Sequence, residues 1–145
     1  METVNSQQAQ RVWQRVHTPP AQTDDTARLI AGEWETAAAC TLLARRTGGK
    51  FGPQLRQLAR RSRSRWAGLQ GIALLHTGRR PPHSHPDTPG QSAAQVLGQC
   101  CRDALERAAL YEQSAALPAP LAAHLAQEQT RDAKLLLELL GNWEL

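Results

Sequence analysis

The spacing of apolar residues along the chain predicts four long amphipathic helices. Apolar positions recur in steps of three and four, which keeps them on one face of a helix. Clusters of Pro and Gly interrupt this pattern at residues 17–23, 47–53, 78–91 and 117–120, where a helix cannot continue. The long helices are therefore expected at residues 24–46, 53–76, 92–116 and 121–140, after a short N-terminal helix at 6–16.

Residues suited to helix ends flank these segments. Thr23 or Asp24 can cap the start of the first long helix and Ser92 that of the third, because their side-chain oxygens accept bonds from free backbone N–H groups. Gly78 and Gly141 follow the second and fourth helices, where a left-handed C-terminal residue belongs.

The lengths of the connections predict how the helices are joined. Short loops join the first long helix to the second and the third to the fourth, so each of these two pairs is expected to be an antiparallel hairpin. The middle link of about fourteen residues can span on the order of 45 Å, whereas a helix of about 22 residues is about 33 Å long. Two hairpins with one long crossover form a ferritin-like bundle. We expect a single domain over 1–145: N-terminal helix and linker at 1–22, hairpins at 23–77 and 92–145, and the crossover at 78–91.

Composition agrees with an all-α fold. Ala and Leu dominate the 41% of hydrophobic residues, and only 4% are aromatic, so a sheet has little to build with. We find no apolar run long enough to span a membrane, and residues 1–10 are too polar for a signal peptide. The three cysteines form no Cys-x-x-Cys, which favours core positions in a reducing cytoplasm. The net charge of +4 is mild and indicates no partner.

Polar residues interrupt the inward stripes of three helices at about the same depth, whereas the third helix has no charge at its centre. These residues are Glu33 on the first helix, Ser62 and Arg65 on the second, and Glu128 with Arg131 or Asp132 on the fourth. An unpaired buried charge costs several kcal/mol, so these groups should pair with one another. Two glutamates face two arginines, and an Arg fork can bridge carboxylates on different helices. Alternatively, some of these side chains lie at the edge of the stripe and reach outward.

At these positions the sequence resembles the ferritin-like superfamily, and rubrerythrin-type domains in particular. In that family the first and third helices each supply a Glu, followed seven residues later by Tyr and then Ala. The second and fourth each supply Glu-x-x-His with a later Leu. The resemblance covers roughly residues 24–141. The framework residues that match are Ala44, Leu69, Thr77, Gly78, Tyr111, Ala115 and Leu135.

The six positions that hold metal ligands in that family have changed in this chain. They are Glu33, Ser62, Arg65, Ala104, Glu128 and Arg131, of which only the two glutamates keep the family residue. Both histidine positions hold Arg, which is always charged and has no lone pair to give a metal. The resemblance thus implies the fold without the di-iron chemistry. No metal and no other cofactor is expected, and we favour a non-catalytic structural or binding protein.

The alternative is a metal-binding ferritin-like protein with a reduced carboxylate site, acting in iron handling or oxidative-stress defence. Such a site would hold one iron or manganese ion on Glu33, Glu128 and either Asp132 or Glu35. Metal analysis separates the two hypotheses. We find no nucleophile–base pair, phosphate loop or zinc motif in the sequence, so no catalytic residues are expected.

Two further candidate sites are better explained as structure. His83, His85 and Asp87 lie between prolines in the crossover, where a solvated connector is favoured over a metal site. Cys100 and Cys101 are neighbours on a helix and point about 100° apart, so they chelate poorly together.

Surface features leave the partner open between an unknown protein and a second copy of the chain. Arginines give the second helix a basic outer face, but no aromatics interleave with them, so nucleic-acid binding is not favoured. The amphipathic N-terminal helix is expected to cover the bundle or form a dimer contact, with membrane binding a weaker choice. The residues concerned are Arg56, Arg60, Arg61, Arg63, Arg79 and Arg80 for the basic face, and Val12, Trp13 and Val16 for the N-terminal helix. Trp34, Trp66 and His124 beside the stripes are expected to be structural.

Overall fold

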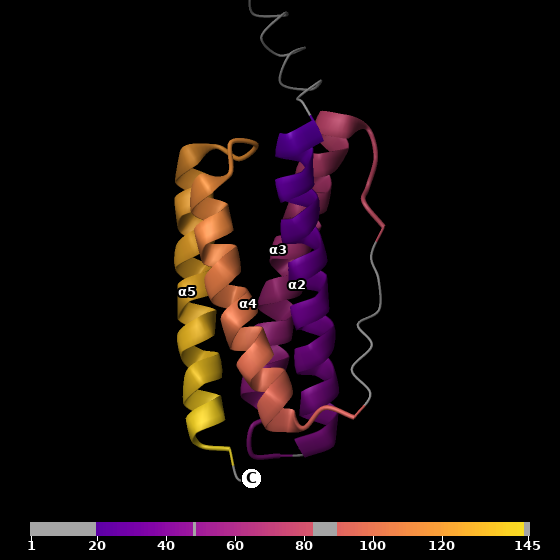
Figure 1. Cartoon of the computed structure of the whole chain (residues 1–145). Coiled ribbons are helices and arrows are strands. Elements are labelled where there is room, and N and C mark those ends of the chain that lie inside the picture. The colour runs from indigo at the N-terminus through magenta and orange to yellow at the C-terminus, as the bar shows by residue number, and fades with distance from the viewer. Residues whose placement is uncertain (1–19, 48, 83–89, 144–145) are drawn as a thin grey trace, which may run out of the picture.

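The chain forms a bundle of long helices in the computed structural model, which describes residues 20–47, 49–82 and 90–143 (Figure 1). The helices are α2 (Pro20–Thr47), α3 (Gly52–Thr77), α4 (Ala93–Gln113) and α5 (Ala119–Gly141). Within these ranges no strand occurs, so the all-α prediction is confirmed. The expected helix at 6–16, with Val12, Trp13 and Val16, lies outside the described residues, as do His83, His85 and Asp87.

The helices pack as two hairpins. α2 lies along α3, and α4 lies along α5, while α2 and α4 make the most extensive backbone contact between the hairpins. In Figure 1, α3 ends where α2 begins, and α4 begins at the opposite end of the bundle. No helix among the described residues is long and apolar enough to cross a membrane.

Two of the four predicted helix-end residues are confirmed. The Ser92 hydroxyl accepts a bond from the Gln95 backbone N–H at 3.2 Å, and the Gln95 side chain accepts one from the Ser92 N–H at 2.9 Å. This reciprocal pair satisfies two backbone donors that the helix leaves free. Gly78 closes α3 in the left-handed region, at φ 72°, and its N–H donates to the Leu74 carbonyl at 2.9 Å.

The other two predicted helix ends are wrong. α2 begins at Pro20, so Thr23 and Asp24 lie inside the helix. Proline suits a first turn because the N–H that it lacks has no partner there. Gly141 is the last residue of α5, and Asn142, with an ordinary φ of −99°, follows it as the cap.

The buried apolar residues form two separate clusters, and a layer of polar side chains lies between them along the bundle. The first cluster includes Cys40, Leu43, Leu55, Leu58, Leu97, Cys100, Leu136 and Leu139. The second includes Leu29, Ile30, Leu69, Tyr111, Leu117, Ala122, Leu125 and Ala126. On α2, Glu33 stands between Ile30 of the second cluster and Cys40 of the first. The interruption expected from the sequence is therefore a break in the apolar core itself.

Candidate functional site

A single guanidinium, that of Arg65 on α3, stands at the centre of the break. Its Nε donates to Glu33 Oε2 at 2.6 Å, and its Nη2 donates to Asp132 Oδ2 at 2.6 Å. Its Nη1 donates to Glu128 Oε1 at 3.2 Å, and Nη2 also reaches Ser62 Oγ at 3.3 Å. The planar fork of arginine allows this use of all three nitrogens at once. One cation thus binds carboxylates from two other helices.

Glu33 on α2 is fully buried and accepts bonds from three neighbouring helices. In addition to Arg65, the Tyr111 hydroxyl donates to Oε2 at 2.7 Å. The Gln129 amide lies 3.1 Å from Oε1 and 3.0 Å from Oε2. Arg107 places its Nε 3.6 Å from Oε1. A buried carboxylate is tolerated when charges and donors surround it in this way.

Arg107 on α4 is the second buried guanidinium. Its Nε donates to Gln129 Oε1 at 3.1 Å and its Nη2 to Thr36 Oγ1 at 2.7 Å. Gly32 on α2 provides the space, because a Cβ there would lie 3.0 Å from both Cδ and Nη1 of Arg107. Arg107 therefore joins the α4–α5 hairpin to α2 of the other hairpin.

The rim of the break is half exposed. Arg61 binds Asp132 Oδ1 through Nε at 3.0 Å and Nη2 at 2.9 Å. On α5, the exposed His124 places its Nε2 2.8 Å from Glu128 Oε2.

We call the whole set the polar layer: Glu33, Thr36, Arg61, Ser62, Arg65, Arg107, Tyr111, Glu128, Gln129 and Asp132. Within it the carboxylates of Glu33, Glu128 and Asp132 match three guanidiniums, so the formal charges balance.

The layer fixes the protonation of two of its members. Burial raises the pKa of the Tyr111 phenol above its ordinary value, and the adjacent Glu33 carboxylate raises it further by charge and hydrogen bond. Burial alone would lower the pKa of the Arg65 guanidinium. Its bonds to Glu33 and Asp132 outweigh that effect, so the pKa of Arg65 is raised. The layer therefore holds a neutral phenol and a permanent cation beside Glu33.

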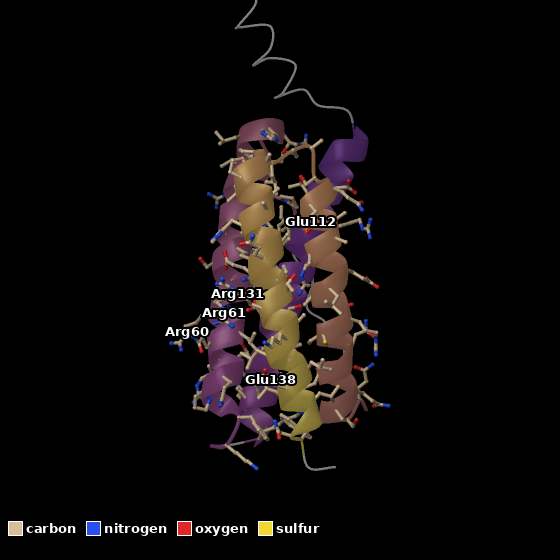
Figure 2. All side chains as sticks on the ribbon, turned by 90° about the vertical axis from the view of Figure 1, so that its left-hand side faces the viewer. Arg60, Arg61, Glu112, Arg131 and Glu138 are labelled. Carbon is tan, nitrogen blue, oxygen red and sulfur yellow. The ribbon has the colours of Figure 1, made fainter. Side chains whose placement is uncertain are left out.

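The residues expected at the ligand positions do not all come together. Glu33, Ser62, Arg65 and Ala104 are buried, and Glu128 is half buried at the rim. Arg131 is exposed, and Figure 2 shows it on the outer side of the bundle, the side that also presents Arg60 and Arg61. The predicted pairing of Arg131 with a glutamate is therefore wrong. Its neighbour Asp132, the other choice left open by the sequence, is the buried one.

Three members of the layer were missed from the sequence: Thr36, Arg107 and Gln129. Arg107 is buried, so the expectation that the third helix has no central charge is wrong. It lies three residues after Ala104 and four before Tyr111, a spacing that places it on the same face. Gln129 is fully buried and lies three residues before Asp132. The two polar residues that α5 turns inward are therefore 129 and 132, and each lies one position after the expected 128 and 131.

The residues present do not fit a di-metal centre. Each carboxylate of the layer already accepts a bond from a guanidinium. Glu35, a candidate ligand for a single ion, is exposed and lines a surface hollow between α2 and α4 instead. Across the described parts of the chain, no group of three or more His, Cys, Asp or Glu side chains is arranged to hold a metal ion.

The two tryptophans beside the stripes join α2 to α3. The rings of Trp34 and Trp66 lie 4.8 Å apart between centroids, tilted by 46°. Arg63, from the basic face of α3, lies over the Trp34 ring at 6.0 Å. The basic face is thus partly used inside the molecule, because Arg61 also belongs to the polar layer.

Fold and site together define a helical bundle whose apolar core is divided by a charge-balanced ion-pair layer. No protein-family model, curated protein or solved structure matches the chain.

Proposed function

We propose that the chain is a ferritin-like bundle of the rubrerythrin type in which the polar layer takes the place of the di-metal centre. In this proposal the protein is cytoplasmic and acts as a non-catalytic structural or binding module. The observation that supports it most is the bonding of one guanidinium, Arg65, to Glu33, Glu128 and Asp132 together.

The chemistry of this arrangement opposes a bound dication. Hard metal ions need several oxygen ligands whose negative charge is free to face the ion. Here a permanent positive charge stands 2.6 Å from Glu33 and 2.6 Å from Asp132. A metal would have to displace Arg65 and leave that cation buried without a partner, which costs several kcal/mol.

The helix directions support the ferritin-like part of the proposal. α3 ends at one end of the bundle and α4 begins at the other (Figure 1). A long crossover between two hairpins is the topology of ferritin-like bundles.

Metal content of the purified protein tests the proposal. Wild-type protein prepared from iron- and manganese-replete cells is expected to hold far less than one ion per chain. The Arg65→His variant removes the central cation and offers an imidazole beside three carboxylates, so it should gain metal. Arg131→His, on the exposed outer side of α5, is the matched control and should not.

One outcome would overturn the proposal. It is stoichiometric metal in the wild type that disappears in the double variant Glu33→Ala, Glu128→Ala. That result would instead support the single-ion carboxylate site and a role in iron handling or oxidative-stress defence.

A further inference from the structure

A hollow of about 510 Å³ lies between α3 and the short segment that follows this helix. Its lining residues are Trp66, Ala67, Gln70 and Gly71 on α3, and Arg80, Pro81 and Pro82 on the segment. A hydrogen bond from the Gln70 amide Nε2 to the Pro81 carbonyl, at 3.1 Å, joins the two sides. None of the lining residues belongs to the polar layer, so the hollow is a separate feature of the bundle.

Gln70 is the buried polar residue of this hollow, with 6% of its surface exposed. Its amide has a defined orientation, because the Pro81 carbonyl can only accept a hydrogen bond and therefore takes the NH2 group. The other end of the amide, Oε1, is also buried, and no described residue donates a hydrogen bond to it. A buried acceptor without a donor is unfavourable. A ligand that fits this hollow should therefore carry an N–H or O–H group that reaches Oε1.

The walls of the hollow suit a flat apolar body. Ala67 and Gly71 lie four residues apart and are therefore neighbours on the surface of α3, beside Trp66. A Cβ added at Gly71 would meet no atom of the described residues within 4 Å. On the opposite side Pro81 and Pro82 present their rings. A mostly apolar hollow with few polar groups is typical of sites for small aromatic ligands.

Arg80 gives the hollow a positive charge. This arginine is exposed, and no Asp or Glu is among the residues that line the hollow. A guanidinium matches the planar geometry of a carboxylate. The charge of the hollow therefore favours an acidic ligand over a cationic one.

We propose that this hollow is a binding site for a small aromatic carboxylic acid that carries an N–H or O–H group on its ring. The ring lies between α3 and the two prolines, its N–H or O–H donates to Gln70 Oε1, and its carboxylate pairs with Arg80. The site shares no residue with the polar layer and does not depend on the ferritin-like proposal.

Calorimetric titration of the full chain with two probes of the same shape tests the hydrogen bond. Indole-3-carboxylate has a ring N–H, whereas benzofuran-3-carboxylate has an oxygen in its place and cannot donate. We expect the wild type to bind the indole compound more tightly by about fivefold or more, because only this probe satisfies Oε1. Gln70→Met removes the acceptor and should make the two affinities equal. The loss of the bond to Pro81 in this variant affects both probes alike, so their ratio reports Oε1 alone.

Two pairs of variants test where the probe binds. Gly71→Leu fills the hollow and should abolish binding of indole-3-carboxylate. Gly68→Leu, on the same helix but outside the hollow, is the matched control and should bind as the wild type does. Arg80→Ala should weaken binding by about threefold, and by less at high salt, because its ion pair is exposed. Arg79→Ala removes the neighbouring exposed arginine, which does not line the hollow, and should change nothing.

The comparison of the two probes uses the unmutated chain, so it does not depend on the folding of any variant. No binding of indole-3-carboxylate at millimolar concentration, equal affinity of the wild type for the two probes, or undiminished binding by a helical Gly71→Leu would each overturn the proposal. Equal binding by Arg80→Ala and Arg79→Ala would overturn the role of Arg80.

Discussion

Removal of Arg65 should expose the energetic role of the polar layer. In Arg65→Met the apolar stem is kept and the guanidinium is lost. Asp132 keeps Arg61 at 2.9 Å, and the half-exposed Glu128 keeps water, so neither is left without a partner. The loss falls on Glu33, which is fully buried and loses its shortest contact, at 2.6 Å.

The size of the effect follows from what remains around Glu33. Breaking a buried ion pair by removing one partner costs about 3–5 kcal/mol. Here Tyr111 still donates at 2.7 Å, Gln129 still donates at 3.0 Å, and Arg107 stays 3.6 Å away. We therefore expect the free energy of unfolding to fall by about 3 kcal/mol, at the lower end of that range. Most domains have about 5–15 kcal/mol in total, so a fold should survive for measurement.

Urea unfolding at neutral pH is the assay, followed by circular dichroism, with a double-mutant cycle to isolate the pair. Glu33→Gln added to Arg65→Met removes the buried charge that has lost its closest partner, and should restore about 1–3 kcal/mol. Arg131→Met is the control, because this exposed arginine should change stability by about 0.5 kcal/mol or less. The reasoning fails if Arg65→Met is as stable as the control, or if Glu33→Gln gives no recovery.

Two further predictions concern proton binding and glycine. The chain has one tyrosine, so tyrosinate absorbance reports Tyr111 alone. Its pKa is raised in the fold, so the native state keeps a proton that the unfolded chain releases above about pH 10. The free energy of unfolding should therefore be highest below that pH and fall as the pH rises. Tyrosinate should appear only as helix content is lost. Titration of the Tyr111 phenol near pH 10 in a fully helical protein would contradict this prediction. In Gly68→Ala on α3 the added methyl group meets open space, so the free energy of unfolding, measured in urea, should rise by about 0.5–1 kcal/mol. In Gly32→Ala the methyl group crowds the Arg107 side chain, so the same increase should be lost. Equal stabilisation by both would show that Arg107 does not need the glycine.

Helix positions were predictable from the sequence because they depend on local signals. The Pro and Gly clusters mark the loops, and each observed helix lies within a few residues of its expected bounds. The stripe of α2 was also predictable: Ile30, Glu33, Ala37, Cys40 and Ala44 are all buried. Steps of three and four determine which residues share a face without any knowledge of the neighbouring helices.

The members of the polar layer were only partly predictable, because a stripe is wider than one residue. On α5 both 128 with 131 and 129 with 132 keep the inward spacing, and the two choices differ by a rotation of about 100°. The packing of α4 and α3 around α5 decides between them. Arg107 was missed for the same reason, since its burial depends on space left by Gly32 on another helix.

The pattern of bonds in the layer also constrains how the hairpins align. Apolar side chains of similar size can slide past one another at small cost, but hydrogen-bonded charges cannot. A shift of one residue along α5 would turn Asp132 away from Arg65 and bring Arg131 toward it. Two guanidiniums would then meet in a buried site, and Glu33 would lose the amide of Gln129. The observed register is the one in which every buried charge of the layer has an opposite charge beside it. The layer thus distinguishes this alignment of the hairpins from its nearest alternative, whatever its net contribution to stability.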